Sequence, residues 1–293
     1  MRQRAHGPAA LLLCALLAAC GTVTQSSAPS SPPSAAATPG PTASRVPTVL
    51  RAYFGLGSTS GNPILAPVER AAPAATDTAT RARAAVDALV NGPAPLELSA
   101  TPAMFTSIPA KTVIKGLQIG GGIATVDLST EFEETEELPA LRTALAQVVF
   151  TLTQFPEITG VNVTIGGAVL SQTDSNGKDL AGPATRADYE DQMGPLFVDA
   201  PAWGASLRTP LQLAGLADVF EATFQFRLLD ASGRSLANGQ LIASCGTGCL
   251  GTFGVEVPFT VTAQTAARLQ VFDLSEQDGS VADIVDYPLT LLP

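Results

Sequence analysis

The residues of this 293-residue chain best suited to chemistry are its carboxylates. Two carboxylates at a suitable separation can cleave a glycosidic bond. One cluster of glutamates is therefore the only serious catalytic candidate, and the activity it suggests is that of a glycan hydrolase. Glutamates placed before a helix are also favoured by the helix dipole and by solvation, and we favour this structural interpretation. The cluster precedes an expected helix and consists of Glu131, Glu133, Glu134, Glu136 and Glu137.

Histidine and net charge exclude several classes of function. The one histidine, His6, lies in an N-terminal segment that we expect to be removed. A mature chain without histidine has no Ser-His-Asp or Cys-His site and no histidine-containing metal site. The formal net charge of −10 repels nucleic-acid backbones, so we expect no nucleic-acid partner. The leading class is therefore a non-catalytic exported protein that needs no cofactor.

Two cysteines, Cys245 and Cys249, flank a glycine-rich turn. A metal site would need two further thiolate or imidazole ligands, which the sequence does not supply. In an oxidising exported compartment we therefore expect a disulfide, with a redox-active pair as the alternative. A calcium site is a weaker hypothesis, because its acidic residues do not match the spacing of an EF-hand and fit a solvated turn. Those residues are Asp273, Glu276, Asp278 and Asp283.

The chain has a single tryptophan, Trp203, in a Pro-Ala-Trp-Gly loop. An exposed indole can stack on a sugar ring or anchor a protein partner, so Trp203 is the candidate ligand-binding residue. An indole in such a loop more often caps a hydrophobic core. A glycine triplet at residues 120–122 suggests a phosphate-binding loop, but no Lys-Ser/Thr follows it and a hairpin turn accounts for it.

The N-terminus has the pattern of an export signal. Arg2 and Arg4 precede an apolar run over residues 9–19, which is too short to span a bilayer and has the length of a signal-peptide core. The run ends in Leu-Ala-Ala-Cys-Gly, which resembles the lipobox of bacterial lipoproteins. In that family the cysteine, here Cys20, receives a diacylglycerol and becomes the new N-terminus. The alternative is a plain signal peptide with an incidental cysteine.

Residues 21–45 are almost entirely Gly, Ala, Ser, Thr and Pro. Such a segment cannot bury enough apolar surface to order itself. We therefore expect a signal peptide over residues 1–19 and a lipid-anchored, disordered linker over residues 20–45. The resemblance to lipoproteins implies a body held at the extracytoplasmic face of the cell membrane.

Residues 46–170 alternate between strand-like and helix-like patterns. We predict strands at residues 49–54 and 160–165, and a hairpin of residues 112–119 and 123–128. Apolar residues recur at helical spacing over residues 79–91 and again after Pro139. This order predicts a mixed α/β domain in which two helices pack on a sheet.

Several motifs in this region resemble the GerMN domain, which takes its name from sporulation and spore-germination lipoproteins. They include Val68-Glu69-Arg70, Leu89-Val90-Asn91-Gly92-Pro93, Thr125-Val126-Asp127-Leu128-Ser129 and, most specifically, the stretch Gln147-Val148-Val149-Phe150-Thr151-Leu152-Thr153-Gln154-Phe155-Pro156. The family is described as non-catalytic, and it also occurs in envelope lipoproteins of bacteria that form no spores. The resemblance therefore implies a domain type and no reaction.

After a polar, turn-rich linker at residues 171–194, residues 195–293 show period-two alternation. Apolar residues occupy every odd position from Phe253 to Val261, and again from Val285 to Leu291. Such runs predict an all-β sandwich of about seven strands. The segments 195–201, 209–215 and 251–253 resemble the immunoglobulin-like domain that often follows GerMN, although Trp203 and the cysteine pair depart from its usual pattern.

These observations predict an α+β protein with two domains. The expected function is a non-enzymatic envelope lipoprotein that binds or assembles through an envelope protein partner. Binding of peptidoglycan or another cell-wall polysaccharide is the alternative, with Trp203 at the candidate face. A carboxylate-dependent hydrolase is the remote alternative.

Overall fold

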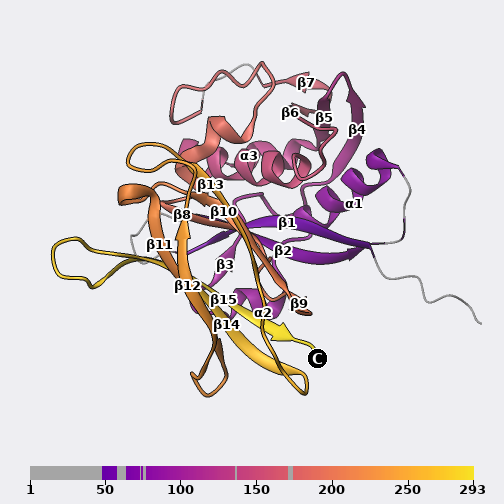
Figure 1. Ribbon diagram of the computed structural model, residues 1–293. Helices are drawn as coiled ribbons and strands as arrows, with labels where there is room; N and C mark the ends of the chain where they lie inside the picture. Colours follow the sequence, from indigo (N-terminus) through magenta and orange to yellow (C-terminus); the bar gives the residue numbers. More distant parts are fainter. Residues whose placement is uncertain (1–47, 58–63, 73, 75–76, 136, 171–173) are drawn as a thin grey trace, which may run out of the picture. The chain divides into compact units, whose positions relative to one another are not determined.

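The computed structural model describes residues 48–57, 64–72, 74, 77–135, 137–170 and 174–293 (Figure 1). All of them belong to one compact unit, Arg45–Pro293. The expected signal peptide, the lipidation site Cys20 and the expected linker at residues 20–45 lie outside the described residues. The observed α+β class agrees with the prediction.

The strands of the first domain form two sheets. One sheet has the order β2-β1-β3, with all neighbours antiparallel. The other has the order β4-β5-β6-β7, with β5 and β6 parallel. The predicted hairpin is confirmed, and Gly121 and Gly122 form its turn at positive φ. The strands are β1 (Thr48–Leu56), β2 (Ile64–Ala72), β3 (Met104–Phe105), β4 (Ile114–Gly120), β5 (Ile123–Leu128), β6 (Gly160–Ile165) and β7 (Ala168–Val169).

Two long helices, α1 (Thr78–Val90) and α3 (Leu138–Leu152), form the helical layer, close to the predicted ranges. The short helices of the domain are α2 (Pro95–Leu98) and the 3-10 helix η1 (Thr130–Glu134). Helix α3 packs against β1 on one side and β6 on the other, so it lies between the two sheets (Figure 1). This position explains why every α3 residue from Leu141 onward is buried. No helix in the described part of the chain is long and apolar enough to cross a membrane.

Polar side chains of α3 and of the turn that follows it complete the backbone hydrogen bonds of β1. Strand β1 pairs with β3 only near its end, which leaves the peptide groups of Arg51 and Tyr53 without a strand on that side. The Gln154 side chain accepts from the Arg51 N–H (2.9 Å) and donates to the Arg51 carbonyl (2.7 Å). Thr151 Oγ1 accepts from the Tyr53 N–H, and Gln147 Nε2 donates to the Tyr53 carbonyl. The glutamines and threonine of the most specific GerMN motif thus satisfy buried backbone groups.

The segment expected to link the domains folds back onto α3. Arg142 of α3 is almost fully buried, and its guanidinium donates to the Asp174 carboxylate (2.5 Å), the Asp188 carbonyl (2.6 Å) and the Asp191 carboxylate. The ring of Tyr189, in the 3-10 helix η2 (Arg186–Gln192), lies 4.7 Å from the guanidinium carbon. The described part of the segment is therefore packed rather than extended. The predicted boundaries at 171 and 194 stay a prediction.

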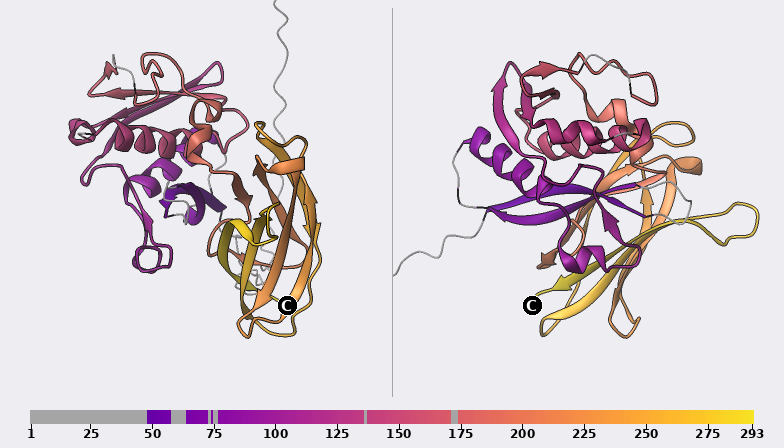
Figure 2. Two further views of the ribbon diagram at one scale, coloured as in Figure 1. Left: turned by 90° about the vertical axis from the view of Figure 1, so that its left-hand side faces the viewer. Right: turned by 180° about the vertical axis from the view of Figure 1, so that it is seen from behind.

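The second domain is a sandwich of two sheets, of order β13-β10-β8 and β12-β11-β14-β15-β9 (Figure 2). It has eight strands where about seven were predicted, the additional one being the two-residue β9. The predicted strand through Val261 ends at Val257, because Pro258 has no N–H to donate to a ladder. The strands are β8 (Leu196–Ala200), β9 (Ser206–Leu207), β10 (Leu211–Ala217), β11 (Thr223–Asp230), β12 (Ser235–Ile242), β13 (Gly251–Val257), β14 (Thr265–Leu274) and β15 (Val281–Leu291).

A buried junction joins the two domains. The Phe150 ring of α3 meets the rings of Tyr53 and Phe197 edge-on, at centroid distances of 5.6 and 5.7 Å. The Tyr53 hydroxyl donates to Asp199 of β8 (2.5 Å) and accepts from Arg186 (3.0 Å). Burial, and then the charge of Asp199, raise the pKa of Tyr53 to about 12, so Tyr53 stays protonated and keeps donating.

Candidate functional site

The disulfide expected between Cys245 and Cys249 is present, with the two Cα atoms 5.9 Å apart. Its loop is held at one end of the sandwich by two backbone donors. The Gly248 N–H donates to Asp218 Oδ1 (2.6 Å), and the Thr247 N–H donates to the Val219 carbonyl (3.1 Å). The bridge therefore stiffens a loop that is already anchored to its neighbours.

Removing this bridge with the double substitution Cys245→Ser and Cys249→Ser will lower the free energy of unfolding by about 2 kcal/mol, the value that loop-closure entropy gives for so short a loop. Thermal unfolding of the oxidised protein and the variant measures the difference. The variant should show no further change on adding a reductant. A loss of more than twice this size would mean that the bridge also supports the fold through packing.

The acidic run does not assemble the features of a carboxylate pair for glycan cleavage. Glu131 lies in η1, and its hydrogen bond with the Ser129 side chain lowers its pKa, whereas a general acid needs a raised pKa. Glu133, Glu134 and Glu137 are exposed to solvent, and Glu136 lies outside the described residues. Within the described ranges, no group of three or more His, Cys, Asp or Glu residues is arranged to hold a metal ion.

Trp203 lies in the wall of a hollow of about 360 Å³. Its backbone N–H donates to the Pro67 carbonyl (2.8 Å) and forms part of a parallel bridge with Val68 of β2. The residue is only 8% exposed. The structure thus makes Trp203 part of the core, although the residue also lines the hollow. Its assignment as a ligand-binding residue stays a prediction.

The rest of this Trp203 hollow combines an apolar wall with a polar rim. The helix α2 contributes Leu96, a residue that is 74% exposed. The hollow is also lined by Arg268 of β14, which donates twice to the carboxylate of Asp286 of β15, at 3.0 and 2.5 Å. Such a bidentate pair fixes both side chains. The hollow can accept an apolar side chain of a partner, or one face of a sugar ring, beside a fixed polar rim.

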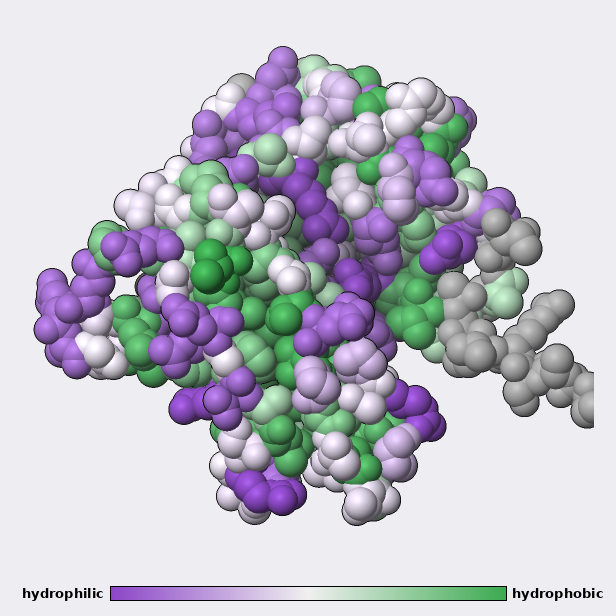
Figure 3. Space-filling model, in the orientation of Figure 1, coloured by the Kyte–Doolittle hydropathy of each residue, from purple (hydrophilic) through white to green (hydrophobic). Residues whose placement is uncertain are grey.

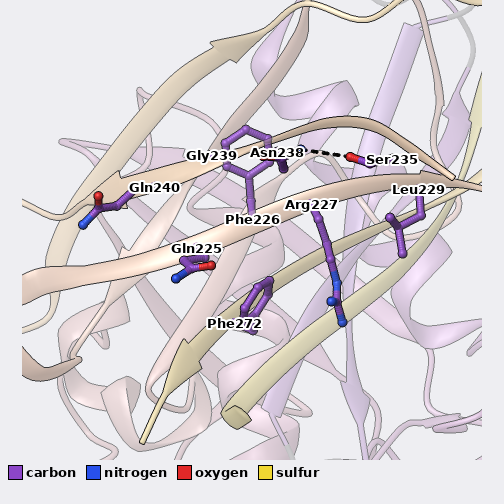
Figure 4. Close-up of a pocket in the computed structure, with 9 residues that line it drawn as sticks. All are labelled: Gln225, Phe226, Arg227, Leu229, Ser235, Asn238, Gly239, Gln240 and Phe272. Carbon is purple, nitrogen blue, oxygen red and sulfur yellow. Dashed lines mark hydrogen bonds between the residues drawn. The ribbon is translucent and has the colours of Figure 1, made fainter. Parts of the chain in front are cut away.

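A second hollow, of about 570 Å³, lies over β11, β12 and β14 (Figure 4). Arg227 stacks over the Phe272 ring at 4.9 Å and donates to Gln270 Oε1 (2.5 Å). Gln225 and Gln240 stand opposite each other on neighbouring strands. Gln225 and Arg227 alternate with the buried residues Phe224, Phe226 and Leu228 along β11, but the strand order that brings the residues of the hollow together was not predictable from the sequence.

The turn before β12 is fixed by one carboxylate. Asp230 accepts from the side chains of Ser232 and Arg234 and from both of their backbone N–H groups. These hydrogen bonds, with Ser232 first, lower the pKa of Asp230 to about 2.

We predict that Asp230 titrates near pH 2 in the folded protein, against an ordinary value of 3.8. A depressed folded-state pKa stabilises the fold above the unfolded-state pKa, and this contribution is lost as the pH falls from about 4 toward 2. An NMR titration of the Asp230 carboxyl carbon measures the pKa directly, and Asp230→Asn should remove this part of the pH dependence. A titration midpoint near 4 would contradict the observed hydrogen bonds.

Comparison with known families agrees with this architecture. Residues 51–171 match the family Germane, described as sporulation and spore germination, and residues 196–280 match Gmad2, described as the immunoglobulin-like domain of bacterial spore germination. The chain contains a Germane domain followed by a Gmad2 domain. The GerMN-like and immunoglobulin-like resemblances drawn from the sequence are therefore confirmed, and both domains of the Germane–Gmad2 chain are germination-associated types.

Several solved structures resemble parts of the Germane–Gmad2 chain. The first GerMN domain of the sporulation protein GerM from Bacillus subtilis is 23% identical, covers 48% of this chain and 99% of its own, and has a TM-score of 0.38. A putative lipoprotein from Clostridium perfringens is 20% identical over 48% of this chain and 89% of its own, with a TM-score of 0.34. The tandem GerMN domains of the same GerM are 15% identical over 84% of this chain and 61% of their own, with a TM-score of 0.38. No curated protein matches the chain.

Proposed function

We propose that this Germane–Gmad2 protein is a non-enzymatic cell-envelope lipoprotein, anchored through Cys20 at the extracytoplasmic face of the membrane. It acts as a binding or assembly module and engages a protein partner. The observation that carries the proposal is the Trp203 hollow, where a mostly solvent-exposed leucine of the Germane domain, Leu96, stands beside a fixed polar rim of the Gmad2 domain.

The hollow has the composition of a protein-docking site. An apolar centre with a polar rim is the usual anatomy of such a site, and aromatic and arginine side chains are its commonest anchors. Trp203, Leu96 and Arg268 supply these elements. The polar groups of the rim are already paired with each other, so covering them with a partner costs little desolvation free energy. Burial of the apolar centre then supplies the affinity.

Binding of a cell-wall glycan is the second candidate. The presence of Trp203 and of the Arg268–Asp286 pair in the lining favours it, because a sugar offers an apolar ring face and hydroxyl groups to such surroundings. Trp203→Ala would leave a cavity in the core and would not separate binding from folding. Trp203→Phe and Arg268→Gln keep most of the packing and are the appropriate variants.

Co-sedimentation of the full chain with purified cell-wall sacculi, over a range of salt concentrations, separates the two candidates. The protein-partner proposal predicts that the chain stays in the supernatant. Saturable, salt-resistant binding that weakens in Arg268→Gln would favour the glycan candidate instead. Hydrolysis of the sacculi by the wild type that disappears in Glu131→Gln would contradict the proposal that the protein is non-enzymatic.

A further inference from the structure

Strand β12 forms an open end of the five-stranded sheet, because it pairs with β11 and with no other strand of the described sheets (Figure 1). Exposed strand edges present unpaired N–H and C=O groups, and proteins usually protect them with charged residues, proline or very short strands. The other described terminal strands follow this rule. Strands β3, β7 and β9 are two residues long, and the longer ones carry Pro67, Lys115, Asp199 or Glu256.

β12 departs from that rule. Its eight residues, Ser-Leu-Ala-Asn-Gly-Gln-Leu-Ile, include no charged residue and no proline. Ile242, at its end, is 70% exposed, and Asn238 and Gln240 are also exposed. The pairing of β12 with β11 shifts register opposite Leu228 and Leu229, where Leu236 has no partner, so the regular part of the edge runs from Ala237 to Ile242. An uncharged, regular edge of this kind is a template for another strand.

The backbone groups that face outward can be identified from the pairing. The Ala243 N–H donates to the Ala222 carbonyl, so Ala243 points its peptide groups toward β11. Since these groups alternate in direction along an antiparallel strand, Gly239 and Leu241 also point inward, whereas Asn238, Gln240 and Ile242 point outward. The free hydrogen-bonding groups therefore belong to the same residues whose side chains are exposed.

This strand is complementary to itself. In an antiparallel pairing about a two-fold axis at Gly239, Asn238 stands opposite Gln240 of the second copy, and both residues have outward peptide groups. Their carboxamides can hydrogen-bond to each other. The two Gly239 residues meet where the backbones approach most closely, so no side chains meet at the axis.

We propose that two copies of this protein associate through β12, joining their five-stranded sheets into one continuous sheet. The symmetry of the strand about Gly239 supports a second copy as the occupant. The net charge of −10 opposes self-association, and β12 limits this repulsion because it brings no charged side chain of its own into the contact. The interaction is isologous and therefore closes at two copies. Because the contact is one strand wide, we expect a weak dimer that membrane anchoring would favour by raising the local concentration.

Gln240→Pro tests the backbone pairing. Proline removes the outward N–H of residue 240 and leaves the bonds between β11 and β12 intact, whereas the matched control Gln240→Ala keeps the N–H. Sedimentation equilibrium of the full chain, in a density-matched detergent and up to about 100 μM, should show a dimer for the wild type and the control. The dissociation constant should rise at least tenfold in Gln240→Pro. A wild type that stays monomeric over this range, or a proline variant that dimerises equally well, would overturn the proposal.

A second pair of variants tests the register and does not depend on tolerance of proline. Asn238→Lys and Gln240→Glu each place a charge on the edge and should each weaken self-association. In an equimolar mixture, the introduced lysine of one chain stands opposite the introduced glutamate of the other, so a heterodimer should form at least as tightly as the wild-type dimer. If the two variants dimerise alone as well as the wild type, or if the mixture forms no heterodimer, the proposed pairing is wrong.

Discussion

Replacing Arg142 with alanine will lower the free energy of unfolding by about 3–5 kcal/mol, because it leaves the buried carboxylate of Asp174 without its cation. Arg142 also holds Asp191 and the Asp188 carbonyl, so the segment around η2 loses these hydrogen bonds to α3 as well. Removing one member of a buried ion pair costs more than the pair itself contributes, since the remaining charge stays desolvated. Denaturant unfolding followed by far-UV circular dichroism measures the loss.

Arg234→Ala is the matched control for this prediction. Arg234 also pairs with an aspartate, Asp230, but its side chain is 74% exposed. Solvent screens an exposed pair of this kind, so the control should unfold almost as the wild type does. Equal losses in the two variants would contradict the buried geometry around Arg142.

Phe150→Ala will lower the free energy of unfolding by a similar amount, about 3–5 kcal/mol, through the cavity that it leaves. The Phe150 ring is fully buried among Tyr53, Phe197 and the guanidinium of Arg186, which lies 4.7 Å from the ring centroid. These contacts belong to both domains, so the variant also weakens their junction. The fluorescence of Trp203 and far-UV circular dichroism report the junction and the whole fold, respectively.

In the wild type we expect the two probes to follow one transition, because the buried core continues across the junction. Phe150→Ala should lower the midpoint for both probes. Phe220→Ala is the control, since Phe220 is 52% exposed and its truncation should change stability by about 0.5 kcal/mol or less. A wild type in which the two probes give separate transitions would contradict a shared core.

The elements of the first domain were predictable because their local signals are strong. Gly92 and Pro93 mark the end of α1, the glycine triplet marks the β4–β5 turn, and the apolar period of α3 is clear. The division of the strands into two sheets was not predictable. The two sheets are separate because α3 is buried on two sides. The sequence does not indicate this burial, because α3 carries the polar residues Gln147 and Thr151, which are buried in the structure. Those residues are inside because they bond to the free peptide groups of β1.

The candidate sites depend even more on tertiary contacts. The residues of the Trp203 hollow come from α2, the loop before β9 and two late strands, and no local spacing connects Leu96 with Arg268. The disulfide was predictable because both of its cysteines lie in one short turn. The packed segment around Asp174 reads as a linker in the sequence, since its polar residues have buried partners only when α3 is beside them. Polar and apolar residues are also mixed over the face of the molecule in Figure 3, so hydropathy alone does not identify a binding face.

Photo-crosslinking at Leu96 tests the central claim, a protein partner at the Trp203 hollow, most directly. The full chain would carry a photo-reactive amino acid at position 96, be expressed in its own membrane and be compared with the same label at Val169, an exposed residue of β7. The account predicts a discrete protein adduct at position 96 that is absent at position 169 and reduced by Arg268→Gln. Absence of a protein adduct at position 96, together with saturable binding of the chain to sacculi, would contradict it.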